Sequence, residues 1–110
     1  MEKITFKTTK KGQYALVEFV CDGELEPSIL ANLNPPDPIK EDIADKIVIL
    51  SGRGPIWLYA FLTHYYHPCS AIAIFDPRLN GAVLTQKHST KIRFSIGDII
   101  PKNEFLESNE

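Results

Sequence analysis

Two apolar runs in the middle of the chain predict the centre of a β-sheet. Residues 46–50 and 71–75 are nearly continuous apolar stretches, which is the pattern of strands that are buried on both faces. Between them, apolar residues recur at helical spacing and predict a helix over residues 55–66. This order of strand, helix and strand is typical of a βαβ unit, whose two strands lie parallel and side by side.

Weaker patterns on either side of this unit predict the remaining elements. The first two predicted strands are joined by a hairpin turn at Gly12, and a short helix follows them. Beyond the central unit we expect two further strands and a polar, frayed tail. The predicted segments are strands over 4–7, 14–20, 82–86 and 91–96, a helix over 26–33 and the tail over 102–110.

The charged residues are distributed unevenly, although the chain of 110 residues has a net charge of only −2. Between Ile47 and Gly97 the single acidic residue is Asp76, whereas five basic residues and all three histidines lie in that window. A basic half-surface on a mildly acidic protein favours a compact polyanionic ligand over long duplex DNA, for which a strongly basic domain is typical. A chance grouping of solvated charges is the alternative.

The length predicts a single domain over residues 1–110, because domains are typically about 100–150 residues long. The N-terminus lacks the apolar stretch of a secretory signal, and no run approaches the roughly 20 apolar residues of a membrane helix. Cys21 and Cys69 have no metal-type spacing and are expected to be reduced thiols. We therefore expect a cytoplasmic protein with no membrane partner.

The residues that follow the two central strands are candidates for ligand binding, since ligands of open α/β sheets bind beyond the carboxyl ends of the strands. Ser51, Gly52 and Arg53 lead into a helix N-terminus, where unpaired N–H groups favour anions. Asp76 is a candidate metal ligand or general base, and Arg78 is placed to clamp a phosphate. For residues 51–53 the structural alternative is a tight turn of small residues. For Asp76 the alternatives are an Asx-type turn or an ion pair with Arg78.

The histidines form a second group of candidates. His64 and His67 share one face of the predicted helix, and His88 follows a predicted strand, from which it can reach a metal or a phosphate. The carboxyl end of that helix is expected at the opposite edge of the sheet from Asp76. Either a site is assembled between subunits, or His67 and Asp76 do not cooperate. A labile Mn²⁺ or Mg²⁺ held by one carboxylate, an imidazole and phosphates is consistent with these residue types.

Three motifs stand close together in residues 51–89. They read G-R-G-P-I-W-L-Y-A-F-L, H-Y-Y-H and A-I-A-I-F-D-P-R-L-N-G-A-V-L, and a histidine follows the last of them. This run of motifs resembles the small CRISPR-associated ring nucleases of the Csx-three type. The predicted fold class is α/β, a small single domain whose mixed β-sheet has a central parallel βαβ unit and about two helices, similar to Rossmann-like CARF domains.

The resemblance implies a manganese-stimulated phosphodiesterase that cleaves cyclic tetra-adenylate, the second messenger of type III CRISPR defence, to linear di-adenylate. It also implies homodimers that associate into tetramers or filaments with the ligand between them. The family is associated with removal of 3′ adenines as well, so a 3′-deadenylating exoribonuclease acting on adenylate-rich RNA is an alternative. A module that binds the cyclic nucleotide without cutting it is another.

Matched residue by residue, the resemblance implies that His67 and Asp76 are catalytic and that Asp76 and His88 are the metal ligands. One extra residue, Asn80, lengthens the turn that precedes His88, which makes the role of His88 less defined. The implied substrate-binding residues are Ser51, Gly52, Arg53 and Arg78.

Overall fold

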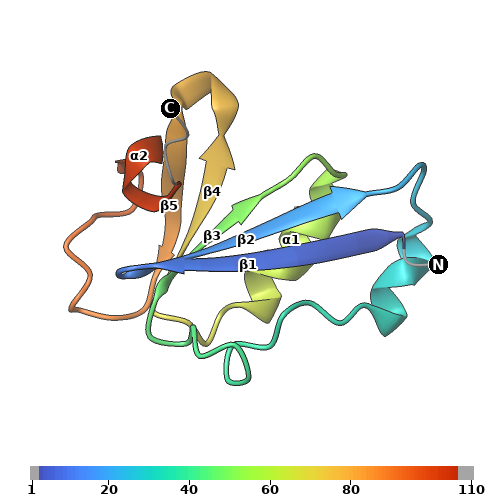
Figure 1. The fold of residues 1–110 in the computed structure, drawn as a ribbon, viewed down its shortest axis with the longest axis horizontal. Helices are drawn as coiled ribbons and strands as arrows, with labels where there is room; N and C mark the ends of the chain where they lie inside the picture. The colour runs from blue at the N-terminus through green and yellow to red at the C-terminus, as the bar shows by residue number, and fades with distance from the viewer. Residues whose placement is uncertain (1–2, 107–110) are drawn as a thin grey trace.

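The computed structural model describes residues 3–106, and its centre is one six-stranded sheet whose strands lie side by side in chain order (Figure 1). Pairing is parallel from β2 to β3 and from β3 to β4, and antiparallel elsewhere. No helix in this part of the chain has the length and apolar character needed to cross a membrane. The strands are β1 (Ile4–Lys11), β2 (Tyr14–Cys21), β3 (Ile47–Ser51), β4 (Ala71–Asp76), β5 (Gly81–Lys87) and β6 (Ile99–Pro101). The helices are α1 (Ile56–Tyr65) and α2 (Lys102–Phe105), with 3₁₀ helices η1 (Pro27–Asn32) and η2 (Pro77–Leu79).

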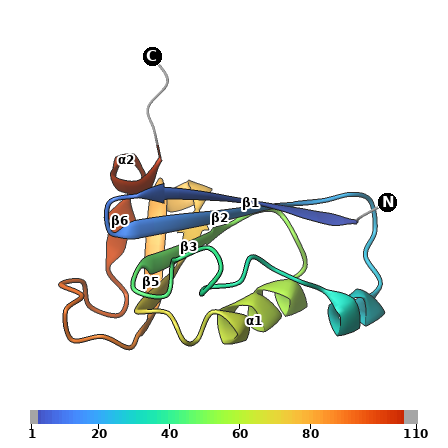
Figure 2. The ribbon, with the colours of Figure 1, turned by 60° about the horizontal axis from the view of Figure 1, so that its bottom comes forward.

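The sheet is covered on both faces, because successive side chains of a strand point to opposite sides. In β3, Val48 and Leu50 belong to the buried cluster that includes residues of α1, whereas Ile47 and Ile49 belong to the cluster that includes α2. Figure 2 shows α1 and η1 on one side of the sheet and α2 on the other. All four of these β3 side chains are fully buried, which explains the continuous apolar run in the sequence.

The predicted α/β class and its central unit are confirmed. The strands β3 and β4 are parallel neighbours, with Ile47 paired with Ala71 and Leu50 paired with Ile74, and α1 connects them. The carboxyl ends of β3 and β4 therefore lie next to each other at one edge of the sheet.

Two flanking predictions differ from the structure. The helix expected over residues 26–33 is the 3₁₀ helix η1, which spans Pro27–Asn32. The prediction of a strand over 91–96 is wrong, because Ile92 and Phe94 pack as loop residues onto the α2 side of the sheet. Their apolar alternation reflects this packing, and β6 takes the position beside β5 instead.

The expected polar tail also contains an ordered anchor. Residues 102–105 form α2, and Phe105 is only 2% exposed. Its ring lies edge-on to the rings of Tyr14 and Phe75, with centroids 6.4 and 6.0 Å apart. The Tyr14 hydroxyl also donates a hydrogen bond to Glu104 (2.9 Å). The rest of the predicted tail, residues 107–110, lies outside the described residues.

We expect Phe105→Ala to lower the free energy of unfolding by about 3 kcal/mol, because the truncation leaves a cavity against the sheet. Urea denaturation followed by circular dichroism measures this change. The exposed neighbour Asn103 provides the control, and Asn103→Ala should stay within about 0.5 kcal/mol of the wild type. Equal losses in the two variants would contradict the anchoring role of Phe105.

Candidate functional site

The turn that follows β3 is fixed from two sides. Gly52 approaches β2 so closely that a Cβ atom at this position would lie 2.6 Å from the carbonyl oxygen of Phe19. Glycine is therefore required for this approach. From α1, the Tyr59 hydroxyl donates a hydrogen bond to the carbonyl oxygen of Gly52 (2.6 Å). These two contacts define the shape of the turn.

A hollow of about 390 Å³ opens at the tips of β3 and β4. Its lining comes from both tips and consists of Ser51, Gly52, Arg53, Phe75 and Pro77. Arg53 is exposed and also borders a second hollow of about 390 Å³, which includes Trp57. The structure thus brings the predicted substrate-binding turn next to the segment that carries Asp76, and leaves open space between them.

The side chains of Asp76 and Arg78 form an ion pair. The Asp76 carboxylate accepts hydrogen bonds from the Arg78 backbone N–H (3.0 Å) and from its guanidinium, whose Nη2 lies 3.1 Å from Oδ2. The hydrogen bonds from the guanidinium and from the backbone hold the pKa of Asp76 below its ordinary value. Both structural alternatives for this carboxylate, a local turn and an ion pair, are therefore present. The Arg78 side chain is nonetheless 88% exposed and accessible to an anion.

His67 and His88 meet at the other end of the same strands. Because β5 runs antiparallel to β4, it brings the chain back to the start of β4. There the His88 N–H donates a hydrogen bond to the carbonyl oxygen of Ser70 (2.8 Å). The imidazole rings of His67 and His88 are arranged edge to face, with centroids 4.3 Å apart. Because β4 has six residues, roughly 17 Å of strand separates this end from Asp76. The expected separation of His67 from Asp76 within one subunit is therefore observed.

Asp76 and His88 do not form one metal site within a single chain, because they lie at opposite ends of the β4–β5 pair. Between residues 3 and 106, no three His, Cys, Asp or Glu side chains are placed to share an ion. Instead, His88 Nε2 lies 2.9 Å from the side-chain oxygen of Gln86. The implied ligand pair therefore fits an ion only if its two members come from different protomers.

Two features of the site were missed by sequence reasoning. The first is the contact of Tyr59 with the turn, which was foreseeable because Tyr59 lies in the first half of a helix that begins just after Gly52. The second is the pairing of His67 with His88. A β4–β5 hairpin of known register places His88 beside the start of β4, but the sequence does not define that register.

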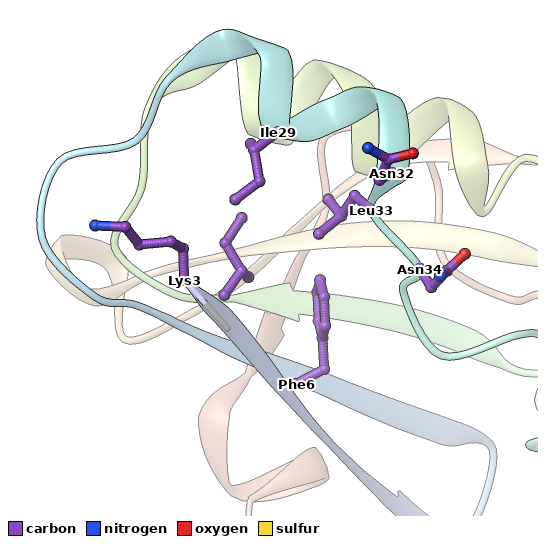
Figure 3. A pocket seen from close by; sticks show the side chains of 7 residues that line it. Lys3, Phe6, Ile29, Asn32, Leu33 and Asn34 are labelled. Atoms are coloured by element: carbon purple, nitrogen blue, oxygen red, sulfur yellow. The ribbon is translucent and has the colours of Figure 1, made fainter. Parts of the chain in front are cut away.

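A third hollow lies away from these residues, between the start of β1 and η1 (Figure 3). It measures about 360 Å³ and has an apolar middle, with the side chain of Lys3 at one end and those of Asn32 and Asn34 at the other. None of the predicted site residues lines it.

The fold and the site define a small α/β protein whose strand tips carry cationic and turn residues suited to a phosphate-rich ligand. Residues 18–101 match the family described as CRISPR-associated protein (Cas_csx3). An uncharacterised protein of Aquifex aeolicus (strain VF5) is 49% identical over 85 residues, which cover 77% of this chain and 75% of that protein. The chain therefore belongs to the CRISPR-associated Csx3 family, which gives it a CRISPR-related role. The matched segment contains every predicted site residue.

We expect Arg78→Gln to raise the pKa of Asp76 toward its ordinary value, because the charged hydrogen bonds that favour the ionised form are lost. As the pH is lowered, Asp76 should then become protonated at a higher pH in the variant than in the wild type. A carboxyl-detected NMR titration measures both proteins. Arg93, which lies over the ring of Phe94, provides a control at another site. An Asp76 pKa that moves equally in Arg93→Gln, or that stays fixed in Arg78→Gln, would contradict the assignment.

Proposed function

We propose that this protein is a ring nuclease, a metal-stimulated phosphodiesterase that cleaves cyclic tetra-adenylate to linear di-adenylate and so switches off type III CRISPR signalling. The hollow at the tips of β3 and β4 supports this proposal most directly. There the open turn with Arg53 lies beside Pro77, the residue that precedes Arg78. Membership of a CRISPR-associated family and a site suited to phosphates both favour a nucleotide second messenger as the ligand.

Each half of the proposed site is incomplete within one chain. The strand tips carry Arg53, Asp76 and Arg78, whereas His67 and His88 lie beyond the other end of β4, which is roughly 17 Å long. We propose that homodimers stack into tetramers or filaments, with the tips of one protomer facing the histidines of another. The adenylate ring is then enclosed between the two.

The proposed reaction uses a nucleophile that the substrate itself supplies. The ribose 2′-OH loses its proton to a base and attacks the adjacent phosphorus in line, the bond to the 5′-oxygen breaks, and that oxygen takes up a proton. His67 serves as the acid and base, with Asp76 of the facing protomer orienting it. Arg53 and Arg78 neutralise the charge that develops on the phosphorane. Two such cuts convert one tetra-adenylate ring into two linear di-adenylates, each of which ends in a 2′,3′-cyclic phosphate because the 2′-oxygen stays on the phosphorus.

The proposed Mn²⁺ or Mg²⁺ ion would be held by Asp76 of one protomer and His88 of the next. Such an ion, when bound, adds positive charge against the phosphate oxygens.

We expect the wild-type protein to convert cyclic tetra-adenylate to linear di-adenylate, and His67→Ala and Asp76→Asn each to lower the rate on the order of 10²–10³-fold. An equal mixture of the two variants should recover up to about a quarter of the wild-type rate, because some contacts between protomers then join an intact His67 to an intact Asp76. Chromatography of the products measures each rate.

Three other results would overturn parts of this proposal. A mixture no more active than its separate components would contradict a site shared between protomers. Cleavage of linear poly(A) without cleavage of the ring would assign a 3′ exoribonuclease. Tight binding of the ring without turnover, equal in the wild type and His67→Ala, would assign a sensor module.

We expect EDTA to lower the rate of ring cleavage on the order of tenfold or more, and added Mn²⁺ to restore it, because the ion offsets phosphate charge in the transition state. The measurement is the initial rate of di-adenylate formation across a chelator titration. EDTA saturated with Ca²⁺ serves as the control for non-specific effects of the chelator. An unchanged rate in excess EDTA would contradict a metal-dependent step.

A further inference from the structure

We propose that Tyr59 is a positioning residue, which turns the peptide bond between Gly52 and Arg53 so that the Arg53 N–H faces the substrate phosphate. This inference rests on the proposed function, and it assigns a task to a residue outside the predicted site. The task depends on one hydroxyl group, so it is separable from the packing of the tyrosine ring.

The Tyr59 hydroxyl lies 2.6 Å from the carbonyl oxygen of Gly52, a short hydrogen bond for an O–H donor. The ring of Tyr59 is held edge to face against the ring of Phe19, with centroids 5.3 Å apart and an interplanar angle of 66°. Burial raises the pKa of Tyr59 above its ordinary value, so the hydroxyl keeps its proton and acts as the donor at neutral pH. The Gly52 carbonyl is therefore drawn toward α1.

The direction of this carbonyl determines the direction of the next N–H. The peptide bonds of the described residues are all trans, and in a trans peptide the C=O and N–H groups point in opposite directions. Because the Gly52 carbonyl points to α1, the Arg53 N–H points away from α1. The hollow at the strand tips lies on that side, since it is lined by Phe75, which packs with the cluster on the α2 face of the sheet.

Two further observations agree with this orientation. The Arg53 N–H donates to no carbonyl group within residues 3–106, so it is available to a ligand. In addition, Gly52 has no side chain to restrict its backbone, and a glycine peptide rotates at little energetic cost. The hydrogen bond from Tyr59 removes this freedom before the ligand binds. The loss of conformational entropy on phosphate binding is therefore smaller.

The test compares Tyr59→Phe with Tyr65→Phe. Both tyrosines lie on α1, and both donate to a backbone carbonyl, since the Tyr65 hydroxyl bonds to that of Pro35 (3.1 Å). Each substitution removes one oxygen atom and keeps the ring. The comparison therefore distinguishes the effect of losing the hydrogen bond to Gly52 from the general effect of losing a tyrosine hydrogen bond on stability.

We expect Tyr59→Phe to raise the Kd for cyclic tetra-adenylate about tenfold, the size of a hydrogen bond to a charged group, and Tyr65→Phe to leave it within about twofold. Because the turn contacts the phosphate in both ground and transition states, KM should rise with Kd while kcat changes little. Calorimetry and initial rates measure these quantities. In ¹⁵N-resolved NMR spectra of the free proteins, the Arg53 amide signal should shift in Tyr59→Phe and stay in place in Tyr65→Phe.

The outcomes separate this inference from the proposed function. If the wild type neither binds nor cleaves the ring, the proposed function fails and the inference falls with it. If the wild type binds and cleaves but both variants behave alike in Kd and in the Arg53 amide signal, only the role of Tyr59 is overturned. A loss confined to kcat would likewise contradict a role in binding.

Discussion

The parallel pairing of β3 with β4 is the constraint on which the rest of the structure depends. It sets the two strand tips side by side, so that the turn after Leu50 and the segment after Phe75 form one surface. An antiparallel pair would have placed them at opposite edges. The pairing also requires a crossover helix, and α1 in turn supplies the hydroxyl that holds the turn at Gly52.

The same arrangement explains why the candidate residues divide into two groups. A crossover helix runs back across the sheet, so its last residues and His67 come to the edge opposite the tips. The antiparallel return of β5 then carries His88 to that same edge. The chain thus has an edge with cations and a carboxylate, and a second edge with two imidazoles. The central strands that join these edges have buried residues on both faces.

The sequence was sufficient for the features that depend on local pattern. The apolar runs predicted β3 and β4 because double-sided burial leaves a continuous signature, and Gly52 and Arg53 were predicted at a strand tip from that topology alone. The alternation at Ile92 and Phe94 led to the wrong prediction of a strand, since loop residues that pack on a sheet can also alternate between buried and exposed positions. The burial of Phe105 was not predicted, because most of its neighbours in the sequence are polar.

The site was predictable only as far as topology determines it. The distance between His67 and Asp76 followed from the βαβ unit. The contact between His67 and His88 depends on the register of β5, and that register includes an irregularity beside Ile72 and Ala73. Long-range packing sets such details, and no short sequence window contains them.

The β4–β5 hairpin has one more consequence, which concerns how copies of the chain can associate. One end of the hairpin carries Asp76 and the other end carries His88, and the length of the two strands keeps these ends apart. A contact that joins the tips of one copy to the imidazoles of another can form in two ways: reciprocally around a two-fold axis, which closes at two copies, or head to tail, which leaves an unmatched surface at both outer ends. Only the head-to-tail arrangement would continue to grow, until a ring closes.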